Sequence, residues 1–210
     1  MDDLLQIEKS LVSVNWLYQH KDATNLIVLD GTIAKVSLHE TDGVFNEYQL
    51  PNAHFFDLKK VFSMQGAVFP NTALPPKDFE NEARKLGINN TSCIVVYDDH
   101  GVYSSPRVWW LFRTMGYTNI AVLDGGFPAW KKANYPIEKK QIQDVELGNF
   151  KASFEPEKLI DSEIVLESVK NRSKQVVDAR SKGRFNATEP EPRKEIRSGH
   201  IPTSTNLPFS

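Results

Sequence analysis

LIVLD, at residues 26–30, is the stretch that decides the fold of this 210-residue chain. Its continuous aliphatic run is typical of a strand that is buried on both faces of a parallel sheet. A related motif, QVVD, returns at residues 175–178, so that Asp30 and Asp178 lie 148 positions apart. A proline-containing segment follows each copy, QLPNAHFF at 49–56 and GHIPTSTN at 199–206. These matches indicate an internal repeat, which bears on every later inference about the fold.

The second copy of this pattern is incomplete. Residues 94–131 follow the first copy and have no counterpart after the second, which would lie near position 245. We therefore expect a chain that is truncated within its second domain. The predicted organisation is a first domain over residues 1–140, a linker over 141–158, where the periodic pattern weakens, and the N-terminal part of a second, similar domain over 159–210.

Strands and helices are predicted to alternate along the first domain. This alternation favours an α/β fold with a parallel sheet flanked by helices. Proline early and glycine late bound two of the helices, as is common for helix ends. The predicted strands are 26–29, 55–56, 94–97, 120–123 and 176–178; the predicted helices are 14–20, 76–86, 106–113, a short one around Trp130, and 162–169 with Ser162 as its cap.

Composition excludes several classes of function. The net charge of −2 argues against nucleic acid as a partner, and no apolar run approaches the roughly 20 residues that span a membrane. The N-terminus lacks a signal-peptide pattern, so we expect a cytoplasmic protein. A single cysteine excludes a disulfide framework and a cysteine-based metal site, and no glycine-rich phosphate loop is present. We expect no cofactor and no metal.

Five short motifs together resemble one family. The chain is similar to the two-domain sulfurtransferases, which comprise thiosulfate sulfurtransferase (rhodanese) and 3-mercaptopyruvate sulfurtransferase. The resemblance implies two similar α/β domains with the active site between them, of which this chain resembles the whole first domain and about a third of the second. The motifs are RVWW at 107–110, LDGG at 123–126, GRF at 183–185, EPEPR at 189–193, and GHIP at 199–202 before NLPF at 206–209.

The resemblance also implies where the chemistry lies. The family's nucleophile is a cysteine in a loop of the second domain, between a buried strand and a helix. Asp98 stands at the corresponding place in the first domain, and a carboxylate cannot carry a sulfane sulfur. The first domain is therefore expected to be a non-catalytic copy. Cys93 lies before this loop among aliphatic neighbours, which predicts a core thiol, so we name no catalytic residue and expect this chain alone to be inactive.

Arg184 and Arg193 are the candidate substrate-binding residues. They match the family's arginine pair, which holds the small anionic donor beside the nucleophile. A planar guanidinium suits this role because it can grip an anion through two hydrogen bonds. The alternative interpretation is a surface arginine that pairs with Glu189 or Glu191.

Other polar and aromatic residues have structural interpretations. Asp98, Asp99 and His100 could form an acid/base cluster, but a solvated or capping loop at a helix N-terminus is the preferred interpretation. Arg107 is predicted to make a structural pair. Trp109 and Trp110 are predicted to pack in the core or at an interface.

One stretch departs from the family. Mercaptopyruvate-type members place an acidic residue and a histidine of the first domain near the site, where this chain has Lys59 and, farther along, Pro70. This departure weakens the mercaptopyruvate assignment. Thiosulfate is therefore the preferred donor and 3-mercaptopyruvate the alternative.

The predicted activity of the parent protein is transfer of sulfane sulfur from a small anionic donor to cyanide or a thiol, through a cysteine persulfide. A non-catalytic binding or regulatory module is the alternative from another class. A phosphatase of related fold is excluded, because Cys93 is followed six positions later by Asp99 and not by arginine. Self-association through the incomplete second domain is also expected.

Overall fold

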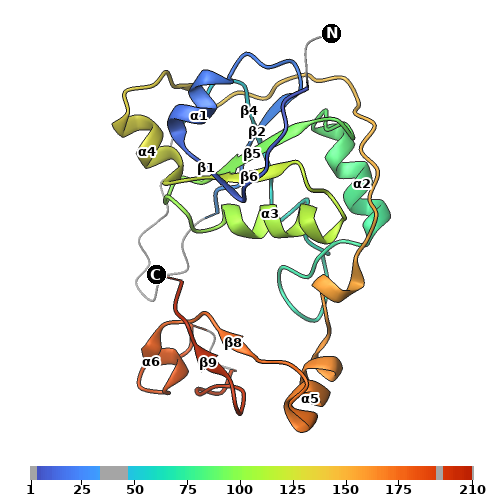
Figure 1. Cartoon of the computed structure of the whole chain (residues 1–210), viewed down its shortest axis with the longest axis vertical. Coiled ribbons are helices and arrows are strands. Elements are labelled where there is room, and N and C mark those ends of the chain that lie inside the picture. The colour runs from blue at the N-terminus through green and yellow to red at the C-terminus, as the bar shows by residue number, and fades with distance from the viewer. Residues whose placement is uncertain (1–3, 34–46, 193–195, 210) are drawn as a thin grey trace. The chain divides into compact units, whose positions relative to one another are not determined.

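The computed structural model describes residues 4–33, 47–192 and 196–209, and the chain divides into two compact units (Figure 1). Unit 1 contains the described residues up to Lys158, and unit 2 contains those from Leu159 onward. Across the described part of the chain, no helix is long and apolar enough to cross a membrane.

A five-stranded parallel sheet forms the centre of unit 1. Its strand order is β1-β6-β5-β2-β4, and β2, the LIVLD stretch, lies between β5 and β4. This confirms the predicted parallel sheet. Strand β1 was not predicted, because two residues are too short to show a period. The strands are β1 (Leu11–Val12), β2 (Leu26–Asp30), β4 (Ala53–Phe55), β5 (Cys93–Tyr97) and β6 (Ile120–Leu123).

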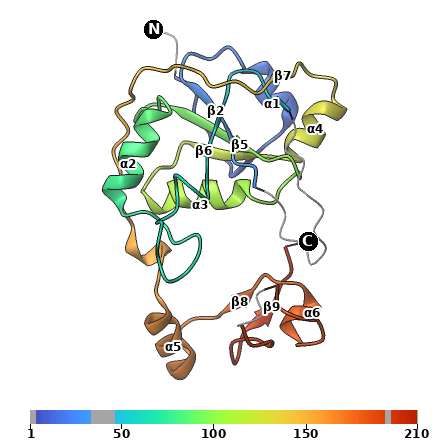
Figure 2. The same cartoon turned by 180° about the vertical axis from the view of Figure 1, so that it is seen from behind.

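Helices cover both faces of this sheet, as the sequence predicted (Figures 1 and 2). Helices α1 (Val14–Gln19) and α4 (Gly126–Lys132) pack on one face, where Leu17 and Trp130 join one apolar cluster. Helices α2 (Pro76–Lys85) and α3 (Ser105–Thr114) pack on the other face.

Strand β5 shows how the sheet serves two cores at once. Ile94 and Val96 belong to the cluster under α2 and α3, whereas Val95 and Tyr97 belong to the cluster under α1 and α4. Side chains alternate across a strand, so a strand buried on both faces must be apolar throughout.

The segment predicted as a linker, residues 141–158, is counted with unit 1 in the structure. It contains no regular element until the 3₁₀ turn η1 (Pro156–Lys158). Phe150 is nevertheless fully buried in the α2–α3 core, and its N–H donates to the carbonyl of Ile88 at 3.0 Å. Just before this segment, β7 (Glu138–Lys139) pairs antiparallel with β3 (Tyr48–Gln49), another pair of two-residue strands that was not predicted.

Unit 2 contains α5 (Ser162–Asn171), β8 (Val177–Asp178), α6 (Lys182–Phe185) and β9 (Thr205–Asn206), with β8 and β9 paired in parallel. The prediction that Ser162 caps α5 is wrong, because Ser162 is the first residue of the helix. The carboxylate of Asp161 caps the helix by accepting the N–H of Ile164 at 2.9 Å. Aspartate and serine are comparably good caps, so the sequence alone did not separate these neighbours.

Candidate functional site

The loop between β5 and α3 is closed around the carboxylate of Asp98. Its Oδ2 accepts the backbone N–H groups of Tyr103, Ser104 and Ser105 at 2.8 to 3.0 Å and the Ser105 hydroxyl at 2.6 Å. Its Oδ1 accepts the N–H of His100 at 2.9 Å. A ring of backbone donors at a helix N-terminus is a favourable environment for an anion. In this loop the anion is the chain's own side chain.

Asp98 is fully buried, and its pKa reflects two opposing effects. Burial raises the pKa of the carboxyl, but the hydrogen bonds from Ser105, Tyr103 and His100 outweigh burial and hold the pKa below its usual value. Of the predicted solvated or capping loop, the capping role is confirmed at Asp98, which is buried, and His100 of the same loop is exposed. A carboxylate that is buried and fully hydrogen-bonded has no means of acting as a nucleophile or proton acceptor here.

Beyond the ends of β2 and β5, hydrogen bonds and an ion pair connect residues of the chain itself. The Oδ1 atom of Asp30 accepts the N–H of Thr32 at 3.0 Å and also the hydroxyl of Thr32, and its Oδ2 pairs with Nζ of Lys140 at 2.8 Å. The Thr32 hydroxyl oxygen in turn accepts the N–H of Asp99 at 3.1 Å. Ligands of open α/β sheets often bind beyond the carboxyl ends of the strands where the chain order reverses. Here Lys140 and Thr32 occupy that place.

Cys93 is fully buried at the start of β5, as predicted. Burial raises the pKa of its thiol to about 12. The thiolate is the nucleophilic form of cysteine, so this thiol is inert near neutral pH.

The remaining predicted residues of unit 1 have structural contacts. The guanidinium of Arg107 donates to the carbonyl of Asn71 at 2.9 Å and lies 4.6 Å from the ring centre of Trp110. The indole N–H of Trp109 donates to the carbonyl of Ile120 at 3.1 Å. Both tryptophans pack against the α2–α3 core, which agrees with the prediction.

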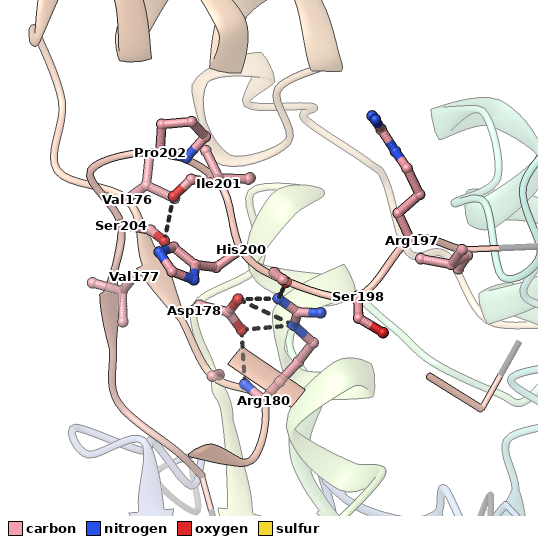
Figure 3. A pocket seen from close by; sticks show the side chains of 13 residues that line it. Val176, Val177, Asp178, Arg180, Arg197, Ser198, His200, Ile201, Pro202 and Ser204 are labelled. Carbon is pink, nitrogen blue, oxygen red and sulfur yellow. Dashed lines mark hydrogen bonds and ion pairs between the residues drawn. The ribbon is translucent and has the colours of Figure 1, made fainter. Parts of the chain in front are cut away.

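Unit 2 has a different arrangement, in which Arg180 joins two carboxylates. Its guanidinium binds Asp178 through Nε and Nη2 and binds Oε1 of Glu191 through Nη1 at 2.7 Å. Nη2 also donates to the carbonyl of Gly199 at 2.7 Å. Arg180 therefore connects β8 to the EPEP segment and to the turn before β9. Figure 3 shows its guanidinium turned toward Asp178.

Glu191 links Arg180 to Arg184. The side chain of Glu191 is only 3% exposed, and its Oε2 accepts from Nε and Nη2 of Arg184 at 3.1 and 2.6 Å. Hydrogen bonds from Arg184 lower the pKa of the Glu191 carboxyl despite its desolvation. Arg184 therefore pairs with Glu191, as in the alternative interpretation of a surface arginine that pairs with Glu189 or Glu191. Its Nη1 has no partner among the residues that the structure describes, and the side chain is about one-third exposed.

Arg193, the second candidate, lies outside the described residues. Arg180 and the bridging role of Glu191 were not predicted. The signal was an arginine two positions after the strand-ending Asp178, and this pattern has no counterpart in the first copy, where Thr32 stands.

An open pocket of about 890 Å³ lies beside β8 in unit 2. Val176 and Ile201 contribute apolar walls, and Arg180 and His200 contribute polar groups (Figure 3). The ring of His200 stacks on Phe185 with ring centres 3.8 Å apart, and its Nδ1 lies 2.8 Å from the carbonyl oxygen of Phe185. Within the described ranges, no group of three His, Cys, Asp or Glu residues could hold a metal ion.

Comparison with known proteins agrees with this architecture. Residues 13–133 match the family model of the rhodanese-like domain. The chain is 37% identical to 3-mercaptopyruvate sulfurtransferase of Mus musculus, over 98% of this chain and 71% of that protein. It is 35% identical to thiosulfate sulfurtransferase of Bos taurus, over 96% and 69%. It superposes on the crystal structure of a 3-mercaptopyruvate sulfotransferase from Escherichia coli with a TM-score of 0.82 at 30% identity, over 95% of this chain and 75% of that one.

Proposed function

The chain belongs to the rhodanese family of sulfurtransferases, and from this premise we propose that its parent protein moves a sulfane sulfur atom from a small anionic donor to a thiol or cyanide. The sulfur is carried as a cysteine persulfide. The persulfide divides the transfer into two nucleophilic displacements, each simpler than a direct exchange between donor and acceptor.

The observation that carries this proposal is the fixed orientation of Arg184. Glu191 occupies the Nε and Nη2 edge of its guanidinium, which leaves Nη1 available to an anion. A guanidinium that is held in place loses little conformational freedom when it binds a ligand. We propose that Arg184 binds the anionic group of the donor, and that Arg193, assigned from the family resemblance, assists it.

The donor is the finer part of the proposal. Sulfurtransferases named for 3-mercaptopyruvate and for thiosulfate are both similar to this chain, at 37% and 35% identity. Several of the most similar relatives are named for 3-mercaptopyruvate, which moves our preference to that donor. Thiosulfate remains the second candidate, favoured by Lys59 at the position where an acidic residue was expected.

With thiosulfate as donor, the transfer takes two steps. A cysteine thiolate attacks the outer sulfur, the sulfur–sulfur bond breaks, and sulfite leaves with the bonding electron pair. Cyanide or a thiolate then attacks the outer sulfur of the persulfide and releases the cysteine thiolate. With 3-mercaptopyruvate the carbon–sulfur bond breaks instead, and the departing enolate takes up a proton to become pyruvate.

We also propose that residues 1–210 alone do not catalyse this reaction. Their one cysteine is Cys93, which is buried and whose pKa is raised to about 12. In unit 1, the loop that corresponds to the family's cysteine loop has its ring of backbone N–H groups occupied by the carboxylate of Asp98. The sulfur-carrying cysteine is then expected in a part of the parent protein other than these residues.

The test is to sequence and express the complete reading frame beside the 210-residue chain, and to assay both with each donor and with cyanide or a thiol. We expect turnover only in the longer protein. Turnover by the 210-residue chain that disappears in Cys93→Ala would overturn the assignment. Absence of turnover with both donors in the longer, folded protein would favour the binding or regulatory module.

In the active protein, Arg184→Ala should lower kcat/KM for the donor by about ten- to a hundredfold, since a charge-assisted contact contributes about 1.5–3 kcal/mol. Lys182→Ala is the matched control, because Lys182 is an exposed cation two residues away. Equal effects of the two substitutions would remove Arg184 from the site.

A further inference from the structure

Unit 1 contains a pocket of about 410 Å³ beyond the carboxyl ends of β2 and β4. Ile33 follows β2 and Phe55 is the last residue of β4, and both contribute to its apolar wall. Phe55 is 48% exposed, so its side chain is open to a ligand. The volume lies in the range of about 300–1,000 Å³ that is typical of sites for small organic molecules.

Three lysines and one carboxylate, that of Asp57, line this pocket. Lys140 already pairs with Asp30 at 2.8 Å. Lys59 and Lys60 are exposed, and their ammonium groups have no acceptor among the described residues. The cavity therefore combines an apolar wall with two available cations.

The backbone that carries Lys59 and Lys60 is held from both sides. Oδ1 of Asp57 accepts the N–H groups of Lys59 and Lys60 at 3.2 and 2.9 Å. The side-chain amide of Gln65 donates to the carbonyls of the same two lysines at 2.8 and 3.1 Å. Oδ1 of Asp57 is thus engaged with its own turn, and the backbone at both lysines is held before a ligand arrives. The Asp57 carboxylate keeps its negative charge beside the pocket, so the two lysines leave the group of three with a net positive charge.

We propose that this lysine pocket binds an organic anion, namely a carboxylate or sulfonate attached to an apolar body of aromatic-ring size. The apolar body lies against Phe55 and Ile33, and the anionic group faces Lys59 and Lys60. The family resemblance would place an acidic residue at position 59, so this chemistry is opposite to what the resemblance implies. The inference uses residues of unit 1 alone, but it shares Lys59 with the choice of sulfur donor above, so its test measures binding of a probe and not turnover.

The test uses naphthalene-2-sulfonate as the probe and the whole 210-residue chain, followed by ¹⁵N–¹H correlation NMR. We expect saturable shifts at the amides of Thr32, Phe55 and Lys140. The neutral analogue 2-naphthalenemethanol should bind more weakly because it lacks the charge. Thiosulfate should also bind more weakly because it has no apolar body. Thiosulfate binding as tightly as the naphthalene probe would overturn the proposed ligand class.

Matched variants locate the charge. Replacing Lys59 and Lys60 together with glutamine should weaken sulfonate binding by about three- to tenfold, as expected for two partly exposed ionic contacts. The control replaces Lys131 and Lys132, two consecutive exposed lysines of α4, with glutamine. This double variant changes the net charge equally and should leave binding unchanged. Equal weakening in both double variants would show a nonspecific charge effect and overturn the proposal.

A third variant tests the apolar wall. Phe55→Ser should weaken both the sulfonate and its neutral analogue by about tenfold, given the apolar area of a phenyl ring. Unchanged amide chemical shifts of the core residues Val96 and Phe112 would show that each variant remains folded. Probe shifts confined to the exposed apolar residues Val177 and Leu207 of unit 2 would contradict the proposed site.

Discussion

Asp30 in unit 1 and Asp178 in unit 2 begin the same turn and complete it differently. Each ends a strand that pairs in parallel with a later strand of its own unit. Each accepts, at 3.0 Å, the N–H of the residue two positions on, Thr32 or Arg180. The backbone geometry of the turn is therefore shared, and the difference lies in the side chain two positions after the aspartate.

Thr32 and Arg180 lead to different surroundings. Among the described residues, the short side chain of Thr32 contacts Asp30 and the N–H of Asp99 through its hydroxyl, so these hydrogen bonds stay within unit 1. Arg180 extends to Glu191, which in turn orients Arg184. The two turns therefore differ at one position: Thr32 only stabilises its own turn, whereas Arg180 helps to orient Arg184, the cation proposed to bind the donor.

The approach to the second strand is shared as well. Asn52 and Thr203 follow Pro51 and Pro202 and both have positive φ, 57° and 68°. Such φ values are uncommon for residues other than glycine. The match supports the interpretation of the two segments as copies of one pattern, a proposal that began with the sequence.

The largest effect on this comparison is expected from Asp98→Ala in unit 1. The substitution removes the acceptor of the buried N–H groups of Ser104 and Ser105 and of the part-buried N–H of Tyr103, at a cost of about 4 kcal/mol in the free energy of unfolding. Urea unfolding followed by tryptophan fluorescence measures this change. Asp124→Ala, at an exposed loop position, is the control and should change stability by less than about 0.5 kcal/mol. Similar values for the two variants would show that the donor ring does not depend on Asp98.

A smaller effect is expected from the two turn positions themselves. Arg180→Ala should destabilise unit 2 by about 3 kcal/mol, because it leaves Asp178 and buried Glu191 without their shared cation. Thr32→Ala should destabilise unit 1 by about 1 kcal/mol, the usual value of a neutral hydrogen bond. Amide hydrogen exchange measures each unit separately. Equal losses at the two positions would contradict the distinction drawn between the turns.

The pH dependence of the stability of unit 1 should show a smaller effect of Asp98 than its replacement by alanine does. Its pKa is lowered in the folded state, so its contribution to stability is complete above its unfolded value of about 3.9 and is lost as the pH falls below that value toward the folded pKa. The free energy of unfolding should therefore decrease as the pH falls below about 4, by about 1.4 kcal/mol in total for each unit by which the pKa is lowered. Asp98→Asn should flatten this slope. An unchanged slope in the variant would assign the acid sensitivity to other carboxyl groups.

The sequence predicted the sheet and its helices because long periodic segments such as 26–30 and 106–113 carry their own signals. It did not predict β1, β3, β7 or β9, each of two residues, because such short strands form only when a neighbour supplies the hydrogen bonds. The position of Asp98 followed from the family resemblance.

The contacts of the candidate site were harder to predict, because they join residues without a shared pattern. The ring of donors around Asp98 depends on the loop conformation. Lys140 meets Asp30 from 110 positions away, and no periodicity connects them. Arg180 was overlooked because arginine two residues after a strand is common, and only its contacts with Asp178 and Glu191 distinguish it.

The smallest expected effect is the near absence of a reaction at Cys93. Its pKa of about 12 leaves very little thiolate at pH 8, on the order of a thousandfold less than in an unfolded chain with a thiol pKa near 8.5. The native protein should therefore react with Ellman's reagent far more slowly than the same protein in denaturant. Cys93→Ala is the blank for both conditions. Rapid labelling of the native chain, with no loss of its folded signal, would mean that the start of β5 opens readily. It would also contradict the interpretation of unit 1 as the copy without a reactive cysteine, in contrast to unit 2 with its proposed substrate-binding arginine.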